Sequence, residues 1–179
     1  MIKLVYVFDF LQLWKVALMV DSMGDIAVPD QKIVRQFNAP DLTFRPASPY
    51  EFASVVRLYD EGGYDGRYQA SDFMLLAMVG TEVVGVVRLV DEQGCRLLRG
   101  LYIAKAWRGR GVGRRLLQAT VAYLKASCYC LAHTALLGLF DKEGFAACGD
   151  EDAPAFLIER RQRYGWTGKT YHILLRPQS

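Results

Sequence analysis

Residues 101–117 read LYIAKAWRGRGVGRRLL, and this stretch decides the fold. An apolar strand runs into a loop that has glycine at three of five successive positions, Gly109, Gly111 and Gly113, and the loop opens directly into an amphipathic helix. Glycine lets the backbone turn tightly and brings its N–H groups close to a ligand. The first amides of a helix lack intrahelical acceptors and lie at its positive dipole end. The stretch therefore predicts a backbone cradle for an anion with several oxygens.

Two familiar phosphate-binding loops do not fit this pattern. A P-loop requires Lys followed by Ser or Thr after its last glycine, but Arg114 and Arg115 stand there. A dinucleotide fingerprint requires G-x-G-x-x-G in a first βαβ unit and an acidic residue about 20 positions further on. Here the glycines lie in mid-chain, and no Asp or Glu occurs from Gln93 to Phe140. These departures disfavour ATP hydrolysis and nicotinamide binding.

Hydrophobic periodicity predicts that the loop belongs to an α/β domain. Three antiparallel strands in succession precede it, and after it the pattern changes from the period of a strand to that of a helix. Gly144 is suited to a left-handed cap at the end of a short helix. The predicted strands are 42–45, 73–79, 83–90, 95–104, 128–132, 145–148 and 170–175, and the predicted helices are 50–59, 113–126, 134–142 and 154–164.

The spacing Arg108-x-x-Gly111-x-Gly113 resembles the Arg/Gln-x-x-Gly-x-Gly/Ala loop of the GNAT N-acetyltransferase superfamily, which holds the pyrophosphate of acetyl-CoA. Residues 44–46, 84–89 and 98–103 resemble the first, third and fourth strands of that family, and Gly144-Phe145 its frequent Gly-Phe pair. The resemblance covers residues 41–176. It implies a mixed, mostly antiparallel sheet flanked by helices, in which the fourth strand and strand 128–132 run parallel but splay apart.

The resemblance also implies a site for acetyl-CoA as co-substrate. Pantetheine would pair with the fourth strand near residues 101–103, and an N–H near Ile103 would polarise the thioester carbonyl and stabilise its oxyanion. The residues expected to contact the cofactor are Leu101, Tyr102, Ile103, Arg108, Gly109, Arg110, Gly111, Val112, Gly113, Arg114 and Phe140. Arg115 is expected to face solvent.

Two side chains that many members of the family use for catalysis are missing from this chain. Where the fourth strand often carries a carboxylate base, the sequence reads Arg96, Leu97, Leu98 and Arg99, and Phe140 stands where a tyrosine often protonates the departing thiolate. His133 is the candidate catalytic group because its ordinary pKa lies near neutrality. The alternative for His133 is a cap on the helix that starts at Thr134.

The sequence allows two roles each for a cysteine and for three strand arginines. Cys128 is either an acyl-carrying nucleophile or a buried strand thiol. Arg88, Arg96 and Arg99 either bind the carboxylate of an acceptor or lie on the surface, as strand arginines commonly do.

The function that follows is an acetyl-CoA-dependent N-acetyltransferase acting on a primary amine of a small molecule, an amino acid or a peptide. Because the base and the acid are missing, a non-catalytic acyl-CoA-binding or regulatory module is the alternative.

Composition indicates one folded domain, since the chain has 179 residues, 52% of them hydrophobic and 23% charged. We expect residues 1–40 to be an extension, a helix or linker packed on the body or on the second copy of a homodimer, and residues 41–179 to be the acetyltransferase domain. The formal charge of +3 and the lack of an apolar run of about 18 residues predict neither nucleic acid nor membrane as a partner. Four sparse cysteines favour a reducing, cytoplasmic setting and no metal site.

Overall fold

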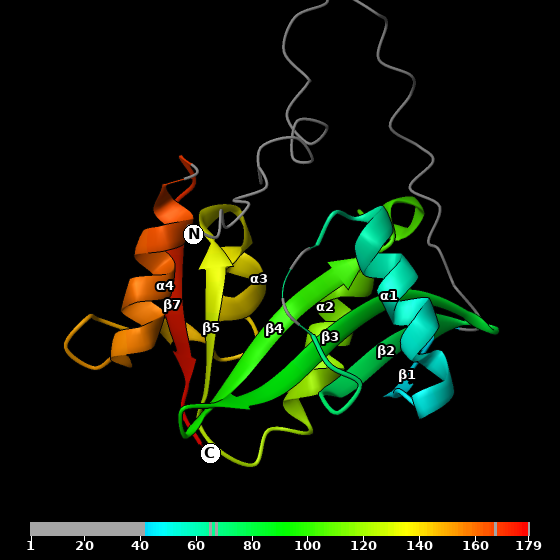
Figure 1. Ribbon diagram of the computed structural model, residues 1–179, viewed down its shortest axis with the longest axis horizontal. Helices are drawn as coiled ribbons and strands as arrows, with labels where there is room; N and C mark the ends of the chain where they lie inside the picture. The colour runs from blue at the N-terminus through cyan, green and yellow to red at the C-terminus, as the bar shows by residue number, and fades with distance from the viewer. Residues whose placement is uncertain (1–41, 65, 67, 167, 179) are drawn as a thin grey trace, which may run out of the picture. The chain divides into compact units, whose positions relative to one another are not determined.

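The computed structural model describes residues 42–64, 66, 68–166 and 168–178, so the predicted extension 1–40 lies outside the described residues. A mixed sheet with the strand order β1-β2-β3-β4-β5-β7-β6 forms its centre (Figure 1). The strands are β1 (Leu42–Pro46), β2 (Phe73–Val79), β3 (Glu82–Glu92), β4 (Cys95–Ile103), β5 (Cys128–His133), β6 (Ala146–Ala147) and β7 (Tyr171–Arg176). The helices are α1 (Phe52–Glu61), α2 (Val112–Val121), α3 (Leu137–Asp141) and α4 (Ala155–Gly165), with short 3-10 turns at Pro49–Glu51, Lys105–Trp107 and Thr134–Leu136.

Helices cover both faces of the sheet, which is why β2 is apolar without alternation, with five successive buried residues. Leu116 and Leu117 of α2 pack on one face together with Phe140 of α3. Helices α1 and α4 pack on the opposite face of the sheet. Side chains at successive strand positions point to opposite faces, so the strands contribute to both cores. Figure 1 shows both helices in front of the sheet. The order of strands and helices predicted from the sequence is confirmed.

The only parallel pairing in the described sheet joins β4 to β5, and it is short. The two strands pair at Arg96↔Cys128 and Leu97↔Tyr129, although β4 continues to Ile103 and β5 to His133. Figure 1 shows the two arrows diverging from this contact. The predicted splay is therefore confirmed, and beyond Leu97 the side of β4 that faces β5 has no strand partner among the described residues.

Two helix boundaries differ from the prediction. Helix α2 ends at Val121 and not at residue 126, because Tyr123 and Leu124 donate backbone bonds three residues back, which tightens and closes the last turn. The predicted helix 134–142 is a 3-10 turn followed by the shorter α3.

Helix α3 ends as the sequence predicted, at a left-handed glycine. Gly144 has φ of +80°, its N–H bonds to Asp141 O at 3.0 Å, and Phe145 N–H bonds to Phe140 O at 3.2 Å. The rings of Phe140 and Phe145 meet edge to face at 5.5 Å between centroids, so a hydrophobic contact seals the cap. The predicted strand 145–148 shrinks to β6, because Phe145 turns into the core and β6 pairs only with the outer side of β7.

Among the helices that the structure describes, we find none with the length and apolar character needed to cross a bilayer.

The turn between β1 and α1 contains an ion pair whose contribution to stability should depend on pH. Glu51 accepts a bond from Ser48 N–H at 2.8 Å and forms an ion pair with Arg45. The guanidinium and the Ser48 bonds lower the pKa of Glu51 from 4.5 to about 2. A lowered folded pKa stabilises the protein above the unfolded pKa, and this stabilisation is lost as the pH falls through the folded pKa. We expect Glu51→Gln to lower the melting temperature near pH 7, and the difference from the parent to vanish near pH 2.

Thermal unfolding measured by circular dichroism from pH 7 to pH 2 checks this expectation, with exposed Glu82→Gln as the control. A difference between Glu51→Gln and the parent that stays constant over this range would contradict an origin in the charge of Glu51.

Candidate functional site

The glycine loop after β4 has a backbone that only glycine adopts readily. Gly109 and Gly111 have φ of +72° and +76°, in the left-handed region. A Cβ built on either residue meets no atom within 4 Å, so the space beside the loop is open. The tight backbone turns predicted at these glycines are present, and the predicted contact of their N–H groups with a ligand stays a prediction.

A row of N–H groups along this loop has no backbone acceptor. Trp107 N–H bonds to Ala104 O at 2.8 Å before the row, and Arg115 N–H bonds to Gly111 O at 3.1 Å after it. Between them, among the described residues, the N–H groups of Gly109 and of residues 111–114 donate no backbone hydrogen bond. Because these donors include the first turn of α2, they also lie at the positive end of its dipole. This row is chemically suited to an anion with several oxygens.

The two loop arginines nearest to β4 contact the residues that precede the loop. Arg108 Nε donates to Ile103 O at 2.9 Å, and its guanidinium lies 5.0 Å from the centre of the Tyr102 ring. The Arg110 guanidinium lies 5.4 Å from the centre of the Trp107 ring. Arg108 therefore ties the loop to the last carbonyl of β4, a role that the motif alone does not reveal.

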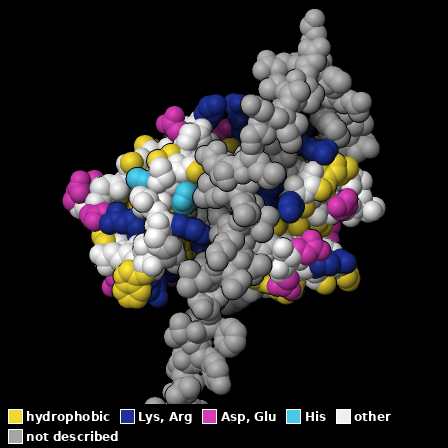
Figure 2. Space-filling view, turned by 90° about the horizontal axis from the view of Figure 1, so that it is seen from above, with side chains coloured by type: hydrophobic (Ala, Val, Ile, Leu, Met, Phe, Trp, Pro, Cys, Tyr) yellow, Lys and Arg dark blue, Asp and Glu magenta, His cyan; other side chains and the backbone are white. Residues whose placement is uncertain are grey.

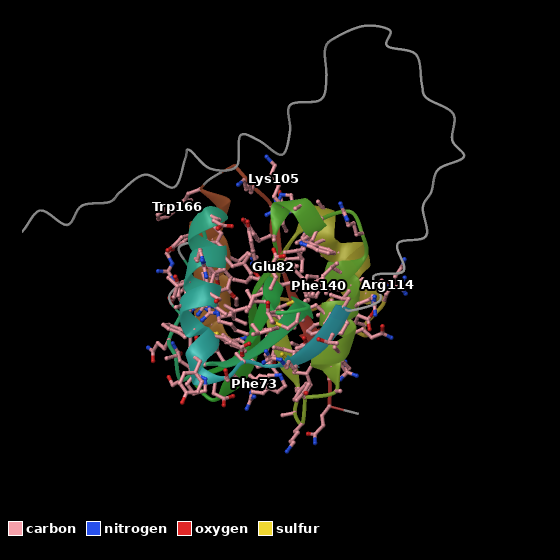
Figure 3. All side chains as sticks on the ribbon, turned by 90° about the vertical axis from the view of Figure 1, so that its right-hand side faces the viewer. Phe73, Glu82, Lys105, Arg114, Phe140 and Trp166 are labelled. Carbon is pink, nitrogen blue, oxygen red and sulfur yellow. The ribbon has the colours of Figure 1, made fainter. Side chains whose placement is uncertain are left out.

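The two arginines inside α2 differ in what they face. Arg115 lies over the Phe44 ring at 5.4 Å, on β1, so it points away from the loop. Arg114 is 59% exposed and lies 3.9 Å from a carboxylate oxygen of Glu143. Figure 3 shows Arg114 pointing outward on the α2 side, while Lys105 lies at the end of the molecule where the loop begins.

The end of β4 presents a backbone donor to its open side. Ala104 N–H bonds to Val84 O at 2.9 Å, next to the register pair Gly85↔Ile103. In an antiparallel ladder this makes Ile103 a residue whose own N–H and C=O face away from β3. The bond from Arg108 to Ile103 O agrees with that direction. A Cβ on Gly113 would lie 3.4 Å from Ile103 Cγ1, so the first turn of α2 adjoins this strand end.

His133 is the last residue of β5, at its splayed end, and caps the 3-10 turn that follows. Its Nδ1 accepts a bond from Ala135 N–H at 3.2 Å, and its ring meets the Tyr171 ring edge to face. His172, on β7, lies with Nε2 3.1 Å from Thr134 Oγ1. Figure 2 shows both histidines at the surface of this end of the molecule, near Lys and Arg side chains. The cap that the sequence offered as an alternative is thus present.

Two further candidates are buried in the core. Phe140 is 4% exposed and lies inside the molecule in Figure 3, so it offers a hydrophobic contact and no proton. Cys128 and Cys130 are buried free thiols, and burial raises the pKa of Cys128 to about 12. A thiol that stays protonated is a poor nucleophile, which argues against acyl transfer through Cys128.

The arginines on the opposite face depart from the surface alternative. Arg88 is completely buried, pairs with Asp72 and donates to Tyr64 OH at 2.9 Å. Arg99 lies 3.3 Å from Glu92, which also pairs with Arg160 of α4. The sequence missed this network because its partners lie far apart in the chain.

Two cavities of about 490 and 80 Å³ lie away from the loop. The larger is at the far end of β3, next to Asp72 and Asp91, and the smaller lies between Ser48 and Met74.

A comparison with protein families decides the identity. The profile described as "Acetyltransferase (GNAT) domain" matches residues 48–156, from the start of α1 to α4. The chain belongs to the GNAT acetyltransferase family. A comparison with curated protein sequences found no match.

Solved structures share the GNAT fold. The N-acetylglutamate synthase from Neisseria gonorrhoeae, solved with coenzyme A and N-acetyl-glutamate, has a TM-score of 0.59 and 19% identity, over 77% of this chain and 35% of that one. The present chain thus spans about a third of that synthase. A GNAT acetyltransferase from Streptococcus pneumoniae gives 0.58 and 17%, over 78% and 100%. The ribosomal-protein-S18-alanine N-acetyltransferase from Escherichia coli gives 0.56 and 10%, over 77% and 94%.

The buried thiols of this GNAT protein provide a test by alkylation. We expect iodoacetamide at pH 8 to modify Cys128 at least ~100-fold more slowly in the folded protein than in urea, because burial keeps the thiol protonated and inaccessible. Partly exposed Cys95 is the control and reacts in both states. Peptide mapping by mass spectrometry measures the rates. Rapid labelling of Cys128 in the folded protein, or a thioester on Cys128 after incubation with acetyl-CoA, would show that Cys128 does act as a nucleophile.

Proposed function

We propose that this GNAT protein transfers the acetyl group of acetyl-CoA to a primary amine of a small molecule, an amino acid or a peptide. The observation that carries the proposal is the row of open amides at Gly109 and residues 111–114, placed beside the free edge of β4. The loop amides suit a diphosphate, and the strand edge suits an extended arm with amide groups of its own. Pantetheine has that chemistry, so the residues present fit acetyl-CoA.

Each part of the site has one task in this proposal. The amides of Gly109 and of residues 111–114 hold the diphosphate, and exposed Arg114 adds positive charge beside them. Residues 101–103 orient the pantetheine arm along β4, and Phe140 belongs to the buried cluster against which Leu101 and Ile103 pack. When bound, acetyl-CoA supplies a thioester carbonyl that the amine attacks. Ile103 N–H, which faces away from β3, donates to the carbonyl oxygen, where charge develops.

The His133 ring can assist the departing sulfur by a hydrogen bond. Because Nδ1 accepts the Ala135 bond, the neutral ring carries its proton on Nε2. This N–H can donate a hydrogen bond to the sulfur, but the neutral ring neither gives up that proton nor accepts one from the amine. The proton that the thiolate takes up comes from the attacking nitrogen, which loses one when the amide forms. An alkyl ammonium with a pKa of about 10.4 is mostly protonated near pH 7, so the amine loses its proton to water before it attacks. Holding the two reactants together then provides much of the acceleration.

The acceptor class is supported by relatives and by the charge on the face between α1 and α4. One of the similar structures is an N-acetylglutamate synthase, and another is a ribosomal-protein-S18-alanine N-acetyltransferase. On the present chain, Arg99, Arg160 and Glu92 lie on that face and leave a net positive charge.

The second candidate is a non-catalytic acyl-CoA-binding module, which is favoured by the absence of a carboxylate at residues 96–99 and by Phe140. Both candidates bind CoA, but only the enzyme releases free thiol from acetyl-CoA when amines are added. A screen of amino acids, peptide N-termini and small amines for thiol release separates them.

The loop predicts loss of CoA binding in a charged variant. Gly111→Asp places a carboxylate in the open space beside the amides and strains a backbone at φ of +76°. We expect calorimetry to show at least ~100-fold weaker CoA binding, from repulsion of the diphosphate.

Gly94→Asp is the matched control, since Gly94 has φ of +77° and equally open surroundings in the β3–β4 turn. It carries the same strain and charge away from the loop and should bind CoA as the parent does. Equal binding by Gly111→Asp and the parent would refute the assignment of the loop.

His133→Asn tests the hydrogen bond from His133 to the sulfur. Asparagine is a good capping residue and can accept the Ala135 bond, but its shorter side chain lacks the Nε2–H group. We expect kcat to fall about 10-fold or more, while His172→Asn on β7 changes it less than ~3-fold. Thiol-release kinetics measure both variants. An unchanged kcat in His133→Asn would leave His133 with its capping role alone.

A further inference from the structure

β4 contains one extra residue within its free edge, just before Leu101. Val86 pairs with Tyr102 and Arg88 with Arg99, so three steps along β4 match two along β3. The extra residue marks a β-bulge at Gly100, which has φ of +59°. A bulge bends its strand and re-aims the groups that follow it, here Leu101 to Ile103.

Helix α1 holds this bulge with a single hydrogen bond. The Tyr59 hydroxyl donates to Gly100 O at 2.7 Å, and Tyr59 is completely buried. A Cβ on Gly100 would lie 2.5 Å from that hydroxyl oxygen, so a residue with a side chain would collide with Tyr59 at this position. Burial raises the pKa of Tyr59 well above its ordinary value, which keeps the hydroxyl a donor across the working range of pH.

A second contact from α1 lies beyond the bulge. Gly62, at the end of α1, lies so close to Tyr102 that a Cβ there would fall 2.2 Å from the ring. The Tyr102 ring in turn lies under the Arg108 guanidinium, which bonds to Ile103 O. Helix α1 therefore touches β4 on both sides of Leu101, and the second contact continues to the glycine loop.

Buried charge keeps Tyr59 in place from the other side. The Arg88 guanidinium lies 6.0, 5.8 and 5.7 Å from the ring centres of Tyr59, Tyr64 and Tyr68, and Asp72 pairs with it. The Tyr59 and Tyr64 rings are 4.5 Å apart. Such close packing leaves the Tyr59 ring little freedom to move away from Gly100.

We propose that Tyr59 is a positioning residue, whose bond to the Gly100 carbonyl fixes the bulge in β4 and so aims the backbone amides of Leu101 and Ile103 at the pantetheine arm and the acyl group. The inference rests on the proposed function, because it assigns a task to a residue outside the cofactor loop. It separates two properties of the site: the loop holds the diphosphate, and Tyr59 sets the direction of the strand edge.

The test is Tyr59→Phe, which keeps the buried ring and removes the bond. We expect kcat to fall about 10- to 100-fold, since misplacement of reacting groups by roughly 1 Å has effects of that size. CoA affinity by calorimetry should stay within ~3-fold of the parent, because the loop amides are untouched. Val55→Ala on the same helix face is the stability control, since it removes buried volume and leaves the Gly100 bond in place.

Amide NMR gives a readout that is independent of turnover. In the parent, CoA should shift two sets of resonances, Gly109, Gly111 and Gly113 in the loop and Leu101 and Ile103 on β4. In Tyr59→Phe the loop set should shift as before, and the β4 set should lose most of its response. Without ligand, the resonances of Gly100 to Ile103 should already differ from the parent, and those of the loop should not.

The outcomes distinguish this inference from the proposed function. If Tyr59→Phe keeps the parent kcat, or both sets respond to CoA as in the parent, the positioning role is wrong and the proposed function stands. If Val55→Ala lowers kcat as much as Tyr59→Phe at equal stability, the effect is structural and the role is also wrong. If CoA shifts neither set in the parent, the proposed function fails and the positioning role fails with it.

Discussion

The parting of β4 and β5 after two residue pairs is the constraint on which the rest of this structure depends. A sheet that stays paired satisfies its backbone groups internally, whereas a strand edge that opens inside a domain leaves donors that need another partner. Ile103 N–H is such a donor, and the amides at the start of α2 are others. The molecule therefore exposes backbone donors that most domains pair internally, and the proposed function uses these donors to hold a thioester.

Holding such an edge in one direction requires support from both faces of the sheet. On one face, α1 contacts β4 through Tyr59 and Gly62. On the other, the first turn of α2 adjoins Ile103, and Arg108 bonds to the carbonyl of the same residue. Burying Arg88 between the tyrosines is expensive unless its charge is paired and hydrogen-bonded, and Asp72 and Tyr64 meet that condition. The resulting rigidity is what a preorganised site needs.

A site built from backbone donors explains how this chain can lack the side chains that many of its relatives employ. Amide groups do not titrate near neutrality, and their direction is set by the strand and the helix that carry them. With no carboxylate at residues 96–99 and Phe140 buried in the core, the proposed function relies on orientation, on Ile103 N–H and on the Nε2–H of His133. Such a division leaves the acceptor side free to vary without disturbing the cofactor side.

The sequence by itself determined the order of strands and helices, the left-handed cap at Gly144 and the glycine loop, because each depends on local periodicity or on backbone angles that a few neighbouring residues dictate. It also determined the family, since Arg108, Gly111 and Gly113 lie close together in the chain. Only the tertiary structure decided that Arg88 is buried and that Tyr59 reaches Gly100 across 41 positions. Those contacts join separate segments, and no local pattern records which distant partner will satisfy a buried charge or carbonyl.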